Sequence, residues 1–333
     1  MPALEYPYPD APAPGTSLEV ASGVQWLSMP LPFALDHINL WLVGDTIIDT
    51  GIGDERTRSL WEKVLGEREV KRVILTHYHP DHAGNAAWLT RKFGVPLWTT
   101  QGEYLTAHAV RESSAGYTSE AVIDVFLKNG LEPERAAKML GRGNRYAALV
   151  PDFPTSYRRI IGGDRLQIGG HEWRAFIGHG HAPEHLSLYC EALNVVIAGD
   201  MLLSTISTNV SVWSIDPEGD PLRLFLESLK SYRELPEDVL VLPSHGKPFR
   251  GAHARVAELE GHHQKHFTKL TEALAEKSLS AGELLGLLFR RPLDAHQTFF
   301  AMGEAIAHLH YLYYAGSLKR TQGTDGIMRY AAS

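Results

Sequence analysis

The sequence predicts an α/β fold, and three observations support this prediction. Short apolar segments of strand length alternate with segments of helical periodicity through the first 250 residues. Five of the loops that follow predicted strands carry Asp or His, and open α/β sheets keep their active sites at such strand ends. The length of 333 residues also suffices for one large domain and a small second one.

The predicted elements of the first hundred residues begin with a β-meander that ends at Asp49 and a glycine turn. A helix, an apolar strand, a second helix and another strand follow. The second helix has small residues at its start, which allow it to begin close to the preceding loop. In order, these elements are expected at residues 24–27, 39–43, 46–51, 57–65, 70–75, 83–89 and 95–98.

Residues 101–150 have helical periodicity and predict an inserted helical layer, clearest at 121–127 and 133–140, with Gly130 and Gly141 as stops. This layer and the residues after it are rich in arginine and tyrosine. Such side chains could grip a substrate anion, although a solvated helix face is the more frequent explanation for any single one. The residues concerned are Arg111, Tyr117, Arg142, Arg145, Tyr146, Tyr157, Arg158 and Arg159.

Strands resume after the helical layer. Two glycine-rich hairpin turns separate the first three, and a pair of strands follows a histidine-rich loop. An amphipathic helix and a last apolar strand complete the pattern. These elements are expected at residues 159–161, 165–168, 172–176, 186–191, 194–198, 222–235 and 239–243.

The composition limits the classes of partner. The 39 acidic and 32 basic residues give a formal net charge of -7, so no overall attraction to nucleic acid or an anionic membrane is expected. Cys190 is the only cysteine, which excludes an intramolecular disulfide and a thiolate metal cage. Residues 1–20 are rich in proline and lack a basic start and an apolar core. We therefore expect a flexible or draped extension of a cytoplasmic protein, and neither a secretion signal nor a membrane span.

The most informative stretch follows the apolar strand at 70–75. It places four metal-capable side chains within six positions, at His77, His79, Asp81 and His82. Imidazole and carboxylate groups suit zinc and several other first-row metals, because both are available at neutral pH without an expensive deprotonation. A solvated histidine-rich loop is the alternative, but such closely spaced imidazoles would repel one another on protonation unless something bound them. The stretch therefore predicts a metal site.

Three later strand ends carry further groups of the same kind. Each comes directly after an apolar strand, at a position where side chains from several strands can converge. They are a loop that contains His179, His181 and His185, then Asp200, and finally His245.

Taken in order, these groups resemble the metallo-β-lactamase superfamily over residues 20–250. The family's His-x-His-x-Asp-His motif is matched without departure by the residues from His77 to His82. Its Gly-His-Thr-x-Gly-His motif is matched loosely by residues 180–185, with Ala182 and Glu184 as departures that affect contacts to substrate and leave the ligand assignment intact. The family's remaining positions fall on His181, Asp200, His245 and the strand-end element Asp49-Thr50-Gly51.

The resemblance implies a four-layer αββα sandwich with two divalent metal ions at one edge, between the two sheets. Zn²⁺ is the expected metal, and the ligand set also admits Fe or Mn. Two ions about 4 Å apart would share a water, lower its pKa and hold a developing oxyanion. One ion would be bound by His77, His79 and His181 and the other by Asp81, His82 and His245, with Asp200 as the bridge.

The resemblance also implies roles for the remaining polar residues of these loops. Asp81 is expected to steer the hydroxide, so Asp81 and Asp200 are the candidate catalytic residues. Asp49 is expected to orient a ligand loop. For His179 and His185 the family offers either support of the ligands or no role, and structural hydrogen bonding is favoured for both.

We expect three parts in the chain: an extension at 1–20, a catalytic domain at 21–250 with the insertion at about 101–150, and a linker helix with a winged-helix-like domain at 251–333. The last part resembles the winged-helix tail of some metallo-β-lactamase-fold hydrolases. A packing or dimerisation module is favoured over a nucleic-acid contact, because the helix at 297–314 contains Glu304 and no Lys or Arg. The tail predicts helices at 253–275, 280–289 and 297–314 and hairpin strands at 318–320 and 327–330.

The first helix of the tail contains His262, His263 and His266. A third metal site is one interpretation of these residues. Their spacing, however, puts only His262 and His266 on one face of the helix. The sequence therefore favours a polar helix that links two units.

The resemblance implies a metal-dependent hydrolase. The favoured activity is hydrolysis of a small ester, thioester or lactone, with the insertion and the tail closing over the site. A single-stranded RNA endonuclease with the same metal centre is the alternative, and β-lactam hydrolysis is an expected side activity at most. A di-iron redox protein would need a flavin domain, and the sequence has no glycine-rich nucleotide fingerprint. The expected partner is a small-molecule substrate, without nucleic acid or membrane, and a homodimer is left open.

Overall fold

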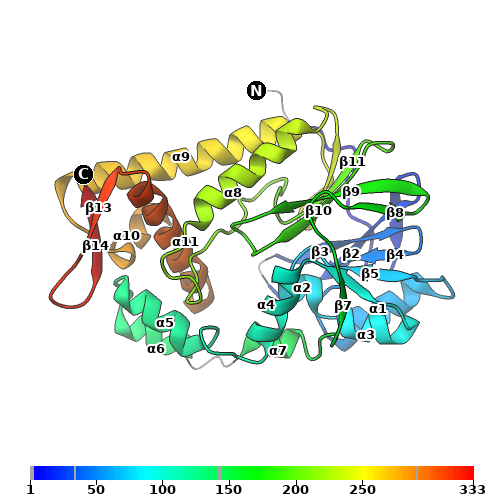
Figure 1. The fold of residues 1–333 in the computed structure, drawn as a ribbon, viewed down its shortest axis with the longest axis horizontal. Helices are drawn as coiled ribbons and strands as arrows, with labels where there is room; N and C mark the ends of the chain where they lie inside the picture. The colour runs from blue at the N-terminus through cyan, green and yellow to red at the C-terminus, as the bar shows by residue number, and fades with distance from the viewer. Residues whose placement is uncertain (1–3, 34, 141–143, 290–291) are drawn as a thin grey trace. The chain divides into compact units, whose positions relative to one another are not determined.

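The computed structural model describes residues 4–33, 35–140, 144–289 and 292–333 (Figure 1). Gly141 and Arg142, expected as a helix stop and as a substrate contact, lie outside the described residues. The chain forms two compact units. The first unit comprises residues 1–112, 146–208 and 228–256, and the second unit comprises residues 113–145, 209–227 and 257–333.

The first unit contains two β-sheets. The seven-stranded sheet keeps the order of the chain, from β1 (Ser17–Ala21) through β2 (Val24–Pro30), β3 (His37–Val43), β4 (Thr46–Ile48), β5 (Arg72–Ile74) and β6 (Leu97–Thr99) to β7 (Tyr157–Arg159). The five-stranded sheet has the order β12 (Leu240–Pro243), β11 (Val195–Gly199), β10 (His185–Cys190), β9 (His171–Gly178) and β8 (Arg165–Ile168). The first four strands pair antiparallel and β4 to β7 pair parallel, whereas only β11 and β12 are parallel in the second sheet.

The core between the two sheets is formed by side chains at alternate positions along the strands. Trp26, Trp41 and Ile74 point from the first sheet into a cluster that also contains Trp173 and Leu188 of the second sheet. Their immediate neighbours in sequence, Leu27, Leu40 and Val73 among them, belong to a separate cluster on the other face. Because successive side chains of a strand point to opposite faces, a strand that is apolar at every position is buried on both faces.

Helices cover the outer face of the first sheet, as Figure 1 shows for α1 and α3. Trp61, Leu65 and Leu89 on these helices pack in the outer cluster of that sheet. The helix α1 begins where the Asp54 side chain accepts a hydrogen bond from Thr57 N, and it ends at Gly66. The helices of the first unit include α1 (Glu55–Leu65), α2 (Pro80–Ala83), α3 (Ala86–Phe93), α4 (Gln101–Arg111) and α7 (Arg145–Leu149).

The outer face of the second sheet is covered by the segment after α8 (Pro221–Leu229), a 3₁₀ helix η1 (Lys230–Glu234). Its Tyr232 is buried, hydrogen-bonds Ser187 across 2.8 Å and packs edge-on against Phe176. Helix, sheet, sheet and helix thus follow one another, and the predicted fold class is confirmed.

Two elements of the first unit differ from the prediction. Residues 17–21, placed in a draped extension, form the edge strand β1, which pairs with β2 from Ser17 opposite Leu27. Strand β7 lies at residues 157–159 and not at 159–161. Both are edge strands with several exposed residues, so the apolar alternation that marks buried strands is weak in them.

The second unit contains helices and a two-stranded sheet, as predicted for the C-terminal part. Its elements are α5 (Ser119–Lys128), α6 (Pro133–Leu140), most of α9 (Ala252–Glu276), α10 (Ala281–Leu288), α11 (Ala295–Tyr314), β13 (Leu318–Gln322) and β14 (Met328–Ala332). Capping boxes at Ser280 and Asp294 start α10 and α11. Within the described ranges, none of the helices has the length and apolarity needed to cross a membrane.

Candidate metal centre

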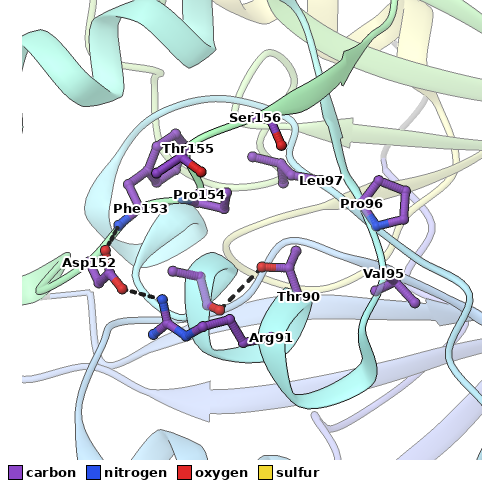
Figure 2. Close-up of a pocket in the computed structure, with 11 residues that line it drawn as sticks. Thr90, Arg91, Val95, Pro96, Leu97, Asp152, Phe153, Pro154, Thr155 and Ser156 are labelled. Atoms are coloured by element: carbon purple, nitrogen blue, oxygen red, sulfur yellow. Dashed lines mark hydrogen bonds and ion pairs between the residues drawn. The ribbon is translucent and has the colours of Figure 1, made fainter.

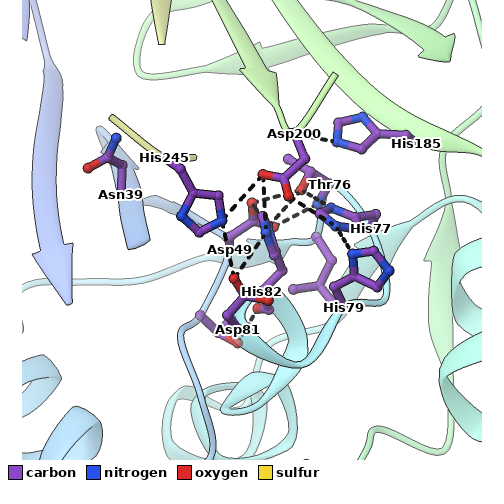
Figure 3. A network of polar contacts seen from close by, with 12 residues as sticks. Asn39, Asp49, Thr76, His77, His79, Asp81, His82, His185, Asp200 and His245 are labelled. Atoms are coloured by element: carbon purple, nitrogen blue, oxygen red, sulfur yellow. Dashed lines mark hydrogen bonds and ion pairs between the residues drawn. The ribbon is translucent and has the colours of Figure 1, made fainter. Parts of the chain in front are cut away.

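The candidate ligands converge because their strands end at one edge. Strands β4 and β5 are parallel, as are β11 and β12, and β9 runs in the same direction as β11 because both are antiparallel to β10. The carboxyl ends of these five strands carry Asp49, the loop from His77 to His82, His181, Asp200 and His245. Figure 3 shows most of these side chains pointing toward one another.

The structure brings all seven predicted ligands into two groups. The ligand-capable atoms within each group lie within 4.8 Å of one another. The first group consists of His77, His79, His181 and Asp200, and the second of Asp81, His82 and His245. These are the groups that the resemblance implies for two separate ions.

Asp200 lies between the two groups. Its Oδ2 is 3.5 Å from Nε2 of His181 and 3.9 Å from Nε2 of His77, in the first group. Its Oδ1 is 3.5 Å from Nε2 of His82 and 3.7 Å from Nε2 of His245, in the second group. Each carboxylate oxygen therefore faces one group, which is the arrangement that a bridging carboxylate requires.

Two buried atoms at the centre of the cluster lack a hydrogen-bond partner among the described residues. They are Nε2 of His82 and Oδ1 of Asp200. Although these atoms are 3.5 Å apart, their geometry does not make a hydrogen bond. Buried polar groups without partners are costly, and a cation that accepts both lone pairs removes that cost. The donor set therefore fits divalent metal ions.

The electrostatics of the cluster also require positive charge. Burial raises the pKa of Asp200, but His245 and His82 outweigh that effect and hold the pKa well below its usual value. Burial lowers the pKa of His245, whereas Asp200 and Asp81 raise it above the ordinary value. Positive charge on the imidazoles thus balances the buried carboxylates. A metal ion supplies the same balance while the imidazoles remain neutral ligands.

Asp49 supports the first ligand loop. Its Oδ1 accepts a hydrogen bond from Thr76 N across 2.8 Å, and its Oδ2 contacts Thr76 Oγ1 at 2.7 Å and His82 Nδ1 at 2.8 Å. The backbone of Asp49 is left-handed, with φ at 60°, a conformation that Asp and Asn tolerate better than most residues. The bond to Nδ1 leaves Nε2 of His82 directed at the cluster. Asp49 thus has the supporting role that was predicted.

Asn39 on β3 holds the loop that carries His245. Its side-chain amide donates to Pro243 O and Gly246 O at 2.8 and 2.7 Å, and its backbone N donates to Ser244 O at 2.7 Å. The indole of Trp26 donates to Asn39 Oδ1 at 2.8 Å and fixes the orientation of the amide. His245 Nδ1 in turn lies 3.0 Å from His37 O, so its Nε2 faces the two carboxylates. Sequence reasoning did not single out Asn39.

His179 and His185 make hydrogen bonds and lie in neither group. His185 Nε2 accepts a hydrogen bond from Asp200 N across 3.1 Å, and His179 Nδ1 lies 2.7 Å from Pro183 O. Gly199, at φ 54°, brings the backbone of Asp200 close to His185. A Cβ at this glycine would lie 2.5 Å from the imidazole ring, so only glycine fits.

Glu103 on α4 joins the two histidine-rich loops and was missed by sequence reasoning. Its side chain is buried, with Oε2 accepting from Tyr78 N at 2.8 Å and Oε1 from Glu184 N at 2.7 Å. Glu184 itself accepts a hydrogen bond from Gly102 N and, through its backbone oxygen, one from Thr100 Oγ1. The departure from the family motif at Glu184 therefore ties this loop to the start of α4. Burial raises the pKa of Glu103 to about 8, although the two N–H donors oppose the shift.

Replacement Glu103→Ala is expected to lower the free energy of unfolding by roughly 2–4 kcal/mol, because two partly buried backbone N–H groups lose their acceptor. Chemical denaturation of the metal-replete protein measures the change. The exposed Glu67→Ala is the matched control and should stay within about 0.5 kcal/mol of the original chain. Equal stability of the two variants would show that Glu103 does not hold the loops.

The arginines and tyrosines proposed as substrate contacts mostly have structural partners in the first unit. Arg111 donates to the carbonyl oxygens of Val150 and Pro151. Tyr146 donates to Tyr78 O across 2.6 Å, beside the first ligand loop. Tyr157 stacks on Tyr104 with ring centroids 4.0 Å apart, and Arg158 lies over Trp98. These contacts explain the residues without a substrate.

A pocket on the first unit lies between the end of α3, β6 and residues 152–156 (Figure 2). None of the seven candidate ligands lines it. Its charged side chains, Arg91 and Asp152, form an ion pair with each other, and Asp152 also accepts from Phe153 N. The pocket therefore offers no group comparable with the cluster at the sheet edge, and we assign the chemistry to the cluster.

The two-sheet fold and the histidine–carboxylate cluster at its edge are features of a metal-dependent hydrolase. The chain belongs to the metallo-beta-lactamase superfamily, because the model of that family matches residues 35–245. The model of the metallo-beta-lactamase-like C-terminal domain matches residues 267–333. The predicted family is therefore confirmed.

Three relatives illustrate the similarity. The crystal structure of a beta-lactamase domain protein from Burkholderia ambifaria has a TM-score of 0.92 and 46% sequence identity, and the match covers 99% of this chain and 98% of that chain. The probable metallo-hydrolase YqjP of Bacillus subtilis is 25% identical over 86% of this chain and 91% of its own length. The hydroxyacylglutathione hydrolase GloC of Haemophilus influenzae is 26% identical over 60% of this chain and 79% of its own length. The protein is a metallo-hydrolase of this superfamily.

Proposed function

We propose that the protein is a binuclear hydrolase that acts on an ester, thioester or lactone of a small molecule. The observation that carries this proposal is the position of Asp200, whose two oxygens face the two ligand groups separately. A mononuclear site would use one such group and would leave the carboxylates and histidines of the other without a cation.

In this proposal His77, His79 and His181 hold one ion, Asp81, His82 and His245 hold the second, and Asp200 contacts both. Zn²⁺ is the proposed metal, and Fe or Mn also suit imidazole and carboxylate ligands. When bound, two such ions supply a water of lowered pKa and an electrophile for a carbonyl oxygen.

Asp81 is the residue of this chain that can accept the proton of the attacking water. Burial raises the pKa of Asp81, but His82 and the contact with His245 hold it below the ordinary value, so the side chain is a carboxylate at neutral pH. Its Oδ2 is 3.3 Å from His245 Nε2, and the side chain is 15% exposed. Asp81 can therefore accept a proton from an attacking water and pass it to solvent.

The thioester is the substrate class with additional support. One relative, which matches 60% of this chain, is named a hydroxyacylglutathione hydrolase, and hydroxyacylglutathione carries its acyl group on sulfur. The motif that departs from the family pattern, at Ala182 and Glu184, lies in the loop tied to α4 by Glu103. Because this loop departs from the family pattern, we propose a thioester substrate whose acyl or thiol group differs from that of hydroxyacylglutathione.

A small-molecule substrate is proposed in preference to nucleic acid. Helix α11 would recognise nucleic acid in a winged helix. More than half of its residues are buried, and these lie between Thr298 and Leu312. The helix also has no Lys or Arg to contact phosphates. A helix buried in this way is not available for a groove, and the part of the chain after residue 280 is better explained as a packing module.

The binuclear proposal predicts that His245→Ala removes about one equivalent of metal per chain, because this residue belongs only to the second group. Elemental analysis of purified protein measures the metal content. His171→Ala, a half-buried histidine of β9 outside both groups, is the control and should leave the content unchanged. Unchanged content in His245→Ala would contradict a second ion.

A parallel substrate screen tests the proposed class of substrate. One preparation is assayed with p-nitrophenyl esters, acyl thioesters, lactones, phosphodiesters, a β-lactam and a labelled single-stranded RNA. We expect turnover of an acyl compound that is lost on chelation and restored by Zn²⁺. Metal-dependent cleavage of the RNA with no turnover of acyl compounds would contradict the proposed acyl hydrolase and would favour an RNA endonuclease.

Lys319→Glu in β13 is expected to change hydrolysis of a small acyl substrate less than about twofold, because an exposed charge contributes little to a buried site. Its neighbour Arg320 is unsuitable for this test, since it pairs with Glu218 and lies 4.7 Å from the ring centroid of Tyr313. Steady-state kinetics at two salt concentrations measure the effect. Strong, salt-dependent loss of RNA binding in Lys319→Glu would instead favour a nucleic-acid contact.

A further inference from the structure

The second unit contains a cluster of histidines that the hydrolase centre does not use. Helix α9 supplies His262, His263 and His266, and α11 supplies Glu304 and His308. His263, His266 and His308 are all buried, with at most 8% of each residue exposed. Helix α9 runs from the first unit into the second, but its histidines do not form a solvated face, because His263 and His266 are buried.

Three of these residues have the geometry of a metal site. One ligand-capable atom from each of His262, His266 and Glu304 lies within 4.8 Å of the others. His262 and His266 are one helical turn apart, with ring centroids 4.5 Å apart, so both face the same side of α9. Glu304 comes from the opposite helix. Two imidazoles and one carboxylate form a ligand set that zinc and iron sites use.

The side chain of His266 has a ligand-capable atom that the described residues do not satisfy. Nδ1 of His266 is buried and has no hydrogen-bond partner among the described residues. A neutral imidazole with an unsatisfied buried nitrogen is a group that a metal ion stabilises.

The carboxylate of Glu304 accepts a long, and therefore weak, hydrogen bond. The side-chain amide of Asn209 donates to its Oε2 across a long 3.4 Å, and Ser211 Oγ donates to Asn209 Oδ1 at 2.8 Å, which turns the amide N–H toward Glu304. A largely desolvated carboxylate usually requires a closer cationic partner. An ion beside it would provide that partner.

The remaining two histidines brace the cluster. His308 Nδ1 donates to Glu304 O at 2.8 Å, which makes Nε2 of His308 an acceptor. His263 Nδ1 then donates to that atom at 3.0 Å and links α9 to α11. These two hydrogen bonds hold α9 and α11 together beside the three candidate ligands.

We propose that His262, His266 and Glu304 form a structural site for a divalent transition-metal ion that fastens α9 to α11. The site is separate in sequence from the seven residues of the hydrolase centre, and its three protein ligands leave a position for water. Its role is to stabilise the second unit, because the ion joins two helices and satisfies the buried imidazole of His266 and the carboxylate of Glu304 together.

The test compares metal titrations of full-length variants. Metal-free protein is titrated with Zn²⁺ in competition with a chromogenic chelator, and the thermal unfolding midpoint is recorded with and without Zn²⁺. The double variant His262→Asn/His266→Asn is expected to bind one equivalent fewer than the original chain. Glu304→Gln, which keeps the volume and removes the charge, is expected to bind that equivalent at least about tenfold more weakly.

Two controls separate this site from the hydrolase centre. His171→Gln on β9 should leave the titration unchanged, and both site variants should retain hydrolysis, because their residues lie outside the proposed catalytic groups. The difference of one equivalent is expected whether the hydrolase centre holds one ion or two. Identical titration curves and identical Zn²⁺-dependent midpoints for the original chain and Glu304→Gln would overturn the proposal, and this variant decides the question if the double variant does not fold.

Discussion

Asp200→Asn is expected to reduce turnover about a hundredfold or more while the fold is kept. The replacement preserves the volume of the side chain. It exchanges one carboxylate oxygen, which faces one of the two ligand groups, for an amide NH₂ that can only donate hydrogen bonds. The amide also removes a negative charge that holds the pKa of His245 above its ordinary value. Steady-state kinetics of metal-replete protein measure the loss, and circular dichroism checks the fold.

The matched control for this replacement is Asp238→Asn, an exposed residue in the turn before β12. It makes the same chemical change outside the cluster and should leave turnover unaltered. If Asp200→Asn holds a full metal content and turns over substrate as fast as the original chain, Asp200 does not belong to the metal centre.

Asp49→Asn is expected to weaken metal binding by the second group about tenfold to a hundredfold, with a corresponding loss of turnover. The amide N–H₂ would face His82 Nδ1, which now lies 2.8 Å from Asp49 Oδ2. To accept that bond, His82 must move its proton to Nε2, the nitrogen that points at Asp81 and Asp200. A protonated Nε2 cannot bind a metal ion.

Backbone strain does not complicate this experiment, because Asn tolerates the left-handed conformation of Asp49 as well as Asp does. Zn²⁺ titration measures the affinity. Asp45→Asn, which removes an ion pair with Lys71 and changes no contact of the candidate ligands, is the control and should bind metal like the original chain. Unchanged affinity in Asp49→Asn would mean that the tautomer of His82 is set by another group.

The sequence predicted the ligands because they occur in short motifs at strand ends, and the topology then brings those ends together. The two-sheet core was also predictable, since strands such as β11, apolar at all five positions, can only be buried on both faces. Edge strands escaped prediction because exposure removes their apolar pattern, as in β7.

The residues that hold the ligands were harder to find. Glu103 resembles any acidic residue in the first turn of a helix, and only the fold shows that it accepts two loop N–H groups. Asn39 carried a weak signal, because asparagine is rare in strands and is followed here by four apolar residues. The histidines of α9 were judged from one helix alone, and their partners on α11 lie more than 35 residues later in the chain.

The hydrogen bonds from Asn39 have a consequence for the order in which the chain folds. They join β3 to a loop 204 to 207 residues later, so the second ligand group can form only after a very long loop has closed. The first group needs the chain only as far as Asp200, whereas the second needs it as far as His245. During synthesis the N-terminal sheet can assemble while the last ligand is still unmade. The centre is therefore completed late, by the strand that closes the second sheet, and a chain shortened before residue 245 would carry only one of the two groups.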